Sequence, residues 1–231
     1  PYWAQHGIDY DNGGVHEALL LDGRPAPHPA KRLRVLARQI YCFSQAKLLG
    51  WDGDAEGILR HCLDTLVSTG WHEDGGWIHL FNPDGSVRDA KRDTYDQCFV
   101  LFGLAWLHRA TGWPEARAWA DRTLDFMYEM LADHAHGGFF EDDARCLPRR
   151  ANPHMHFLEA MLAWYEATGE AHYLDRAHAM ATLFERHFFD ADNSTLSEYF
   201  DCDWTPLRAN AGDRRVEPGH HYEWAWLLSR F

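Results

Sequence analysis

Two stretches of the sequence combine histidines with carboxylates at a spacing that suits proton transfer. The first is Glu217-Pro-Gly-His-His-Tyr-Glu-Trp224, where Pro218 favours a first helical turn and Gly219 allows close approach to the backbone. His220 and Glu223 are three residues apart, so on a helix they share one face. An imidazole beside a carboxylate is suited to general acid–base catalysis. A capped helix with an ordinary surface histidine would give the same pattern.

The second stretch is Ala151-Asn-Pro-His-Met-His-Phe-Leu-Glu-Ala160. Asn152, His156 and Glu159 follow helical spacing, so the three side chains are expected on one face. His154 is two residues from His156 and is expected to point elsewhere. Both stretches place a glutamate three residues after a histidine near the start of a predicted helix. This coincidence favours a shared site over two structural histidines.

The histidine spacing does not match a helical metal site. A zinc pair on a helix needs histidines at positions i and i+4, as in HExxH. Neither His154 and His156 nor His220 and His221 have this spacing. The sequence therefore predicts acid–base chemistry that uses no metal and no other cofactor.

A repeat positions these stretches. Gly13-Gly14, Gly75-Gly76 and Gly137-Gly138 recur at an interval of 62 residues, and Asn193-Ser-Thr-Leu196 replaces the glycines in the last unit. Two helical segments lie between successive double glycines, and each first segment stops at a glycine. A short strand-like excursion follows each double glycine, such as Gly76 to Phe81 before a turn. The predicted helices cover roughly 29–49, 54–68, 94–110, 114–132, 153–167 and 172–187, and a seventh begins at residue 218.

A repeated helix pair of this length predicts an all-α toroid. The period exceeds the ~34 residues of tetratricopeptide and the ~40 of HEAT repeats. We expect the first helix of each pair, beginning near Pro29, Thr94, Pro153 and Pro218, to line the interior. The remaining helices would lie outside. Arg34, Arg38, Tyr41 and Gln45 then form a polar stripe on the first inner helix, although a solvated outer face could also carry such arginines.

Composition excludes several classes of protein. The chain of 231 residues is 46% hydrophobic with 11 Trp, which indicates a globular protein. A net charge of -13 argues against a nucleic-acid partner. No apolar run approaches the ~20 residues that cross a bilayer, and no signal peptide opens the sequence. Five scattered cysteines without a CxxC pair suggest a reduced, cytoplasmic protein.

Four motifs in order resemble the N-acylglucosamine 2-epimerase superfamily. They are 37–43 (ARQIYCF), 94–100 (TYDQCFV), 152–160 (NPHMHFLEA) and 217–224 (EPGHHYEW). The last two are most similar to the branch of mannose isomerases and mannose 2-epimerases. The resemblance implies an (α/α)6 barrel with a sugar in its axial cavity, and a cis-enediol intermediate handled by two histidines. It implies that His220 is one catalytic histidine and that Glu223 orients its neighbours. The residues implied to hold the sugar are Arg38, Tyr95, Asn152, His156 and Glu159.

The resemblance also leaves parts of the site open. The second catalytic histidine of the family lies far towards the end of a twelve-helix chain, whereas this sequence stops at Phe231 in its seventh helix. We therefore expect 1–231 to be one toroid domain, incomplete at its C-terminus. A family arginine corresponds to either Arg214 or Arg215. The expected partner is a small sugar, and the expected state is a monomer or homodimer.

Other functions fit parts of the sequence. Within the family, an N-acylglucosamine 2-epimerase or a mannose-6-phosphate isomerase are alternatives. A glycoside hydrolase on the same toroid would need two carboxylates across the cavity. A toroid that only binds other proteins would need no inward histidines or arginines. The carboxylates available to a hydrolase are Asp93, Asp96, Glu159 and Glu223.

Overall fold

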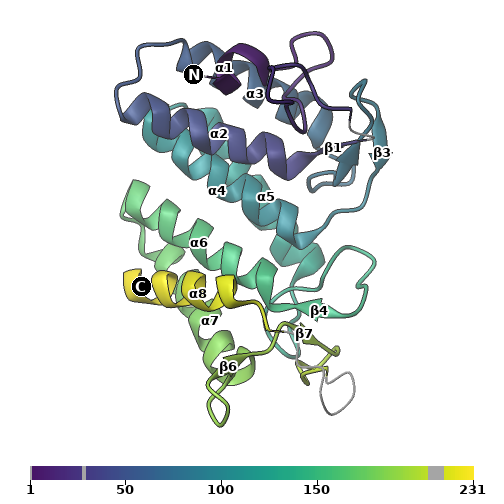
Figure 1. The fold of residues 1–231 in the computed structure, drawn as a ribbon. Helices are drawn as coiled ribbons and strands as arrows, with labels where there is room; N and C mark the ends of the chain where they lie inside the picture. The colour runs from purple at the N-terminus through teal and green to yellow at the C-terminus, as the bar shows by residue number, and fades with distance from the viewer. Residues whose placement is uncertain (1, 28–29, 208–215) are drawn as a thin grey trace.

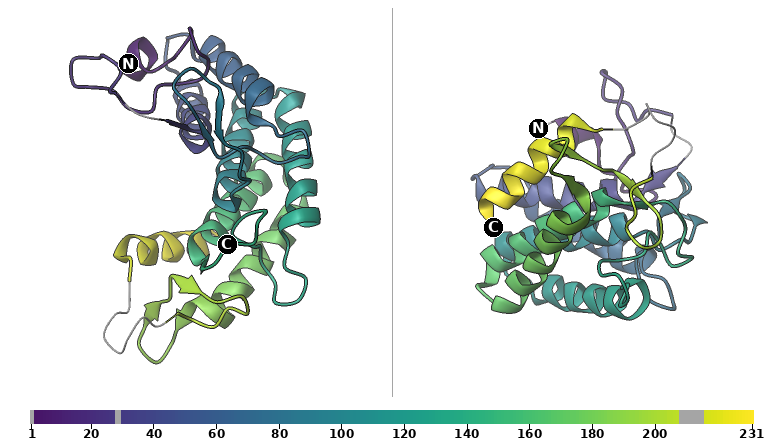
Figure 2. Two further views of the ribbon diagram at one scale, coloured as in Figure 1. Left: turned by 90° about the vertical axis from the view of Figure 1, so that its right-hand side faces the viewer. Right: turned by 90° about the horizontal axis from the view of Figure 1, so that it is seen from below.

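The computed structural model describes residues 2–27, 30–207 and 216–231. It is mostly helical, and its helices form two layers that follow an arc (Figures 1 and 2). A short helix α1 (Tyr2–His6) precedes the layers. The inner layer contains α2 (Leu33–Leu48), α4 (Thr94–Thr111), α6 (Ala151–Thr168) and α8 (Pro218–Arg230). The outer layer contains α3 (Ala55–Gly70), α5 (Pro114–Phe126) and α7 (Ala171–Leu183).

Short antiparallel strands lie along the side of the arc on which the inner helices begin (Figure 1). One sheet joins β1, β2 and β3, a second joins β4 and β7, and β5 pairs with β6. The strands are β1 (Lys31–Arg32), β2 (Leu80–Phe81), β3 (Val87–Asp89), β4 (Arg149–Arg150), β5 (Phe189–Asp190), β6 (Thr195–Leu196) and β7 (Tyr199–Phe200). The predicted hairpin is confirmed, since β2 and β3 flank a turn in which Gly85 has a φ of 84°.

The predicted all-α pairing is confirmed, with differences at helix ends. Pro29 lies outside the described residues, and α2 begins only at Leu33 because the preceding two residues form β1. α6 begins before Pro153, which is tolerated because the first turn of a helix leaves its N–H groups unbonded. α5 and α7 continue as π-helical turns, η1 (Met127–Leu131) and η2 (Phe184–Phe188).

The core follows from the sequences of the middle inner helices. α4 packs between α2 and α6, and each of these three packs on an outer helix. Twelve residues of α4 are buried, including polar Asp96 and Gln97, as expected of a helix that has neighbours on several sides. Four tryptophans are fully buried within the described residues: Trp77, Trp164, Trp204 and Trp224. Among the residues that the structure describes, no helix is long and apolar enough to span a membrane.

The double-glycine turns need glycine for a geometric reason. Gly138 has a φ of 70°, and a Cβ there would lie 2.7 Å from His154 Nε2. That nitrogen accepts a hydrogen bond from the Phe139 N–H, and His154 Nδ1–H donates to the Arg150 carbonyl. Burial lowers the pKa of His154 to about 3, so the ring is neutral. The two hydrogen bonds direct the His154 ring towards the double-glycine turn and away from the Glu159 that His156 contacts, as predicted.

Arg149 is a buried cation that joins three segments. Its side chain is 1% exposed and donates to Asp133 Oδ2 at 2.7 Å. It also donates to the carbonyls of Gly137, Phe139 and Cys202. The guanidinium lies 3.5 Å from the centre of the Trp204 ring. These contacts hold β4, the double-glycine turn and the segment after β7 together.

We predict that Arg149→Met destabilises the protein by about 3–5 kcal/mol, because it leaves the buried Asp133 carboxylate without its cation. Urea denaturation of the full-length protein would measure the free energy of unfolding. Arg117→Met is the matched control. It breaks a partly exposed pair with Glu170, worth at most about 1 kcal/mol. Equal losses in the two variants would contradict a special role for Arg149.

Candidate active site

The inner helices begin along one side of the arc, and three of the four are bonded at their start to the following unit. In three cases the first backbone N–H of an inner helix donates to a carbonyl of the loop that precedes the next inner helix. This bond satisfies one of the N–H groups that a helix start leaves unpaired. The bonds are Leu33 N to His79 O at 3.3 Å, Thr94 N to Glu141 O at 3.0 Å and Ala151 N to Glu198 O at 3.1 Å.

The side chains of these loop residues reach the start of the next inner helix. Glu141 binds the side chain of Arg150, at the N-terminus of α6. Earlier in the chain, Glu17 binds Arg32 in the same way at the start of α2. Before α4 and α8 the corresponding pairs contain a histidine. They are His79 with Asp96, and Glu198 with His220.

His220 is held by Glu198. Its Nδ1–H donates to Glu198 Oε2 at 2.9 Å. The Glu198 side chain is 5% exposed, while that of His220 is 24% exposed. The hydrogen bond to Glu198 raises the pKa of His220 against the effect of burial, and the charge of Glu223 adds to the rise. Because Nδ1 is occupied, Nε2 is the nitrogen of His220 available to a substrate.

The carboxylate that contacts the imidazole of His220 is Glu198, from the loop before α8, and not Glu223 on the same helix. Glu223 places Oε1 3.8 Å from His156 Nδ1 on α6. The role of Glu223 in orienting its neighbours stays a prediction.

His156 lies between two carboxylates. Its Nδ1 is 3.0 Å from Glu159 Oε2, which confirms that these two residues share a face of α6. With Glu223 they form a trio whose potential ligand atoms lie within 4.8 Å of one another. One imidazole and two carboxylates are groups that bind divalent metals. Spacing within one helix could not reveal this set, because it draws on both α6 and α8.

Arg38 and Tyr95 continue the site from α6 across α4 to α2. Arg38 Nη2 donates to the Tyr95 hydroxyl at 3.0 Å, and the guanidinium lies 4.1 Å from the centre of the Phe99 ring. The Tyr95 ring meets the His156 ring edge-on, with centroids 5.1 Å apart. Burial raises the pKa of Tyr95, so its hydroxyl keeps its proton and can donate it to a ligand.

Asn152 lies one helical turn before His156 and is half-buried. Its side-chain oxygen is buried and makes no hydrogen bond within the described part of the chain. Arg214 and Arg215 lie outside the described residues. The structure thus joins Arg38, Tyr95, His156, Glu159 and Glu223 by direct contacts, and the charge of Glu223 reaches His220.

The repeat contained a signal for Glu198 that our sequence analysis missed. Glu17, His79 and Glu141 each follow the second glycine of a double glycine by three residues. Glu198 occupies the same structural position, since its carbonyl also receives the first N–H of an inner helix. The missing glycines of the last unit concealed the correspondence.

Comparison with known proteins agrees with this geometry. The family model for N-acylglucosamine 2-epimerase (GlcNAc 2-epimerase) matches residues 13–231. A mannose-6-phosphate isomerase of Rhizobium meliloti is 40% identical over 100% of this chain and 60% of its own length. A cellobiose 2-epimerase of Bacteroides fragilis is 28% identical over 99% of this chain and 61% of its own length. The chain thus spans about 60% of the length of these relatives.

Solved structures support the fold. The cellobiose 2-epimerase of Spirochaeta thermophila superposes with a TM-score of 0.88 at 26% identity. The match covers 100% of this chain and 59% of that protein. The resemblance based on four motifs is therefore confirmed, and so is the (α/α)6 barrel architecture that it implied.

We predict that Glu198→Gln lowers the pKa of His220, because the neutral amide removes the charge that favours the imidazolium. An NMR titration of the imidazole nitrogens would measure this, with the native pKa above the usual 6.5. Glu17→Gln changes the equivalent loop residue, which binds Arg32, and should leave the titration of His220 unchanged. An unaltered pKa in Glu198→Gln would contradict the pairing.

Proposed function

We propose that this chain, which belongs to the N-acylglucosamine 2-epimerase family, supplies a catalytic base to a sugar isomerase or 2-epimerase. The observation that carries the proposal is the hydrogen bond from His220 Nδ1–H to Glu198, which leaves Nε2 of His220 without a partner among the described residues. The reaction moves the proton on C2 of an aldose. The substrate class that we favour is an aldose of mannose configuration, converted to fructose or to its 2-epimer.

The chemistry begins at a carbon made acidic by the neighbouring carbonyl. His220 Nε2 takes the C2 proton, the electron pair forms a C1=C2 double bond, and the carbonyl oxygen gains a proton to give a cis-enediol. Delivery of a proton to C1, with loss of the O2 proton as the C2 carbonyl forms, gives the ketose. Delivery to the opposite face of C2, with loss of the O1 proton as the C1 carbonyl re-forms, gives the epimer, a step that would use the second histidine of the family.

Polar groups on the neighbouring inner helices are suited to stabilise the developing negative charge and to hold the sugar. Arg38 is a cation whose position is held by Tyr95 and Phe99. Preorganised donors of this kind stabilise an oxyanion most where water is excluded. His156 directs its Nδ1–H to Glu159, so its Nε2 can accept a hydrogen bond from a sugar hydroxyl. Asn152, with its unpaired buried oxygen, is suited to accept a hydrogen bond from a sugar hydroxyl.

The names of the relatives support isomerisation or epimerisation of a sugar, but they name different sugars, so the substrate must be identified by experiment. One is a mannose-6-phosphate isomerase and another a cellobiose 2-epimerase. Both reactions move a proton at C2. Incubation of the full-length protein with mannose, fructose, their 6-phosphates, cellobiose and N-acetylglucosamine, followed by product analysis, would identify the substrate. Release of sugar from a glycoside would instead support a hydrolase.

We predict that His220→Ala in the full-length protein lowers turnover by ~100-fold or more, the usual scale for a lost acid–base group. In deuterated water the native enzyme should place deuterium at C2 of the aldose, and the variant should not. The free energy of unfolding of the variant should be measured as well, because His220→Ala leaves the buried Glu198 carboxylate without its hydrogen-bond donor.

His134→Ala is the matched control, because His134 is exposed on a turn far from α8 in the sequence. Its turnover and deuterium incorporation should equal those of the native protein. Undiminished deuterium incorporation in His220→Ala would remove His220 from the chemistry.

We also predict that activity survives exhaustive chelation, because the proposed steps need only protein donors and acceptors. Dialysis against EDTA, followed by an activity assay and metal analysis, checks this. If activity were lost and one divalent ion restored it, His156, Glu159 and Glu223 would be the first ligands to test.

A further inference from the structure

Most basic side chains near the starts of the inner helices are matched by carboxylates. Such pairs neutralise each other and leave little charge for a ligand. The matched residues are Lys31 with Asp9, Arg32 with Glu17, Arg92 with Asp143, Arg149 with Asp133, and Arg150 with Glu141. Arg34 and Arg38, four residues apart on α2, are less fully matched: Arg34 approaches a carboxylate through Nε, and Arg38 pairs with no carboxylate among the described residues.

Arg34 contacts one buried carboxylate through its Nε atom. Its Nε lies 3.4 Å from Asp96 Oδ1, and the Asp96 side chain is fully buried. Both atoms are buried without a hydrogen bond, so the contact is an ion pair without hydrogen-bond geometry. No described residue accepts a hydrogen bond from either terminal nitrogen of Arg34, whose side chain is 16% exposed.

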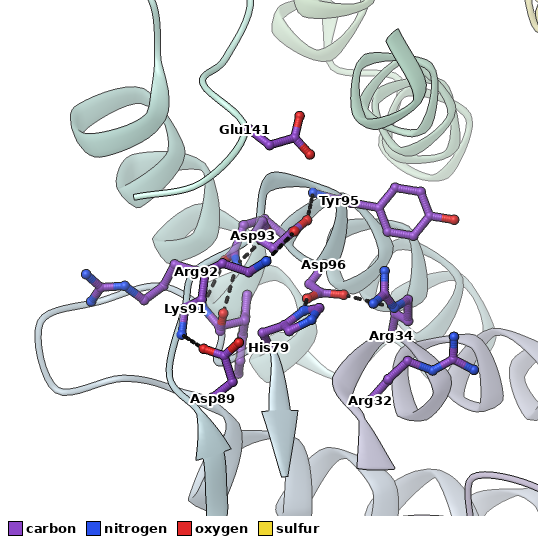
Figure 3. Close-up of polar contacts among 12 residues, drawn as sticks. Arg32, Arg34, His79, Asp89, Lys91, Arg92, Asp93, Tyr95, Asp96 and Glu141 are labelled. Carbon is purple, nitrogen blue, oxygen red and sulfur yellow. Dashed lines mark hydrogen bonds and ion pairs between the residues drawn. The ribbon is translucent and has the colours of Figure 1, made fainter. Parts of the chain in front are cut away.

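His79 approaches the same carboxylate from the other side. Its Nδ1–H donates to Asp96 Oδ2 at 2.5 Å, and its side chain is 15% exposed. Figure 3 shows Asp96 between His79 and Arg34, with an interaction to each. No described residue bonds to His79 Nε2. Buried Asp96 therefore positions both the guanidinium of Arg34 and the imidazole of His79.

These two side chains lie beside the proposed reaction centre. The Arg34 guanidinium is 5.1 Å from the centre of the Tyr95 ring, whose hydroxyl binds Arg38. Arg34 precedes Arg38 by one turn, roughly 5.4 Å along α2. In a hexose 6-phosphate the phosphate is at the opposite end of the carbon chain from the reacting C1 and C2. A group that binds the phosphate must therefore lie about the length of the sugar away from the residues that move the C2 proton.

We propose that Arg34 and His79, both positioned by Asp96, bind the phosphate of a sugar phosphate. The inference rests on the proposed function and deepens it, because it makes phosphorylated sugars the preferred substrates. A guanidinium offers paired N–H groups that match phosphate oxygens, and the imidazolium form of His79, which also carries a hydrogen on Nε2, adds a third donor to the bound anion. The carboxylates Glu159 and Glu223 lie on α6 and α8, so repulsion would direct a phosphate towards α2.

Calorimetry with unreactive sugar alcohols tests the subsite without requiring turnover. The full-length protein should bind mannitol 6-phosphate at least ~10-fold more tightly than mannitol, the scale of a charge-assisted hydrogen bond. Arg34→Gln should remove most of that difference. Arg122→Gln changes the charge equally on the outer helix α5, where Arg122 lies over Trp119, and should retain the difference.

Kinetics then separates the subsite from the proposed function. The ratio of kcat/KM for mannose 6-phosphate to that for mannose should fall ~10-fold or more in Arg34→Gln and in His79→Phe. Equal binding of the two alcohols by the native protein, or unchanged discrimination in Arg34→Gln, would overturn the subsite. Selective binding of mannitol 6-phosphate without isomerisation of any sugar would support the subsite and overturn the function.

Discussion

The structure depends on one recurring hydrogen bond, from the first N–H of an inner helix to a loop carbonyl of the next unit. A helix start exposes unpaired N–H groups, and a bond from outside the helix fixes where it begins. The residue that supplies the carbonyl also supplies a side chain at the mouth of the following helix. Glu198 therefore both holds α6 and binds His220 on α8. One residue thus contacts both the start of a helix and the histidine that we propose as the base.

Buried charge supports this arrangement where the chain is least regular. Arg149 lies in β4, which pairs with β7 directly after Glu198. An ion pair taken out of water adds little net stability, but loss of one partner is costly because the other charge remains buried. The Arg149–Asp133 pair therefore acts mainly to specify one arrangement of the loops. That arrangement sets the position of Glu198 and, through it, the orientation of the imidazole of His220.

The sequence could predict what is local or periodic. The spacing of double glycines identified the helix pairs, and the three-residue spacing of His156 and Glu159 identified a real contact. Contacts between segments were beyond this reasoning. Glu198 and His220 are 22 residues apart, and His79 and Asp96 are 17 apart. Neither separation has a helical or strand period, because each pair joins a loop to a helix start.

The hydrogen bonds between successive units also impose an order on folding during synthesis of the chain. A ribosome releases the chain from its N-terminus, and early segments fold while later ones are still being made. The first turn of α2 can acquire its bond to His79 only after the next unit has emerged, and the same holds for α4 with Glu141. Each nascent helix pair thus waits for its successor. Until then the first N–H of its inner helix lacks the partner that it has in the folded protein.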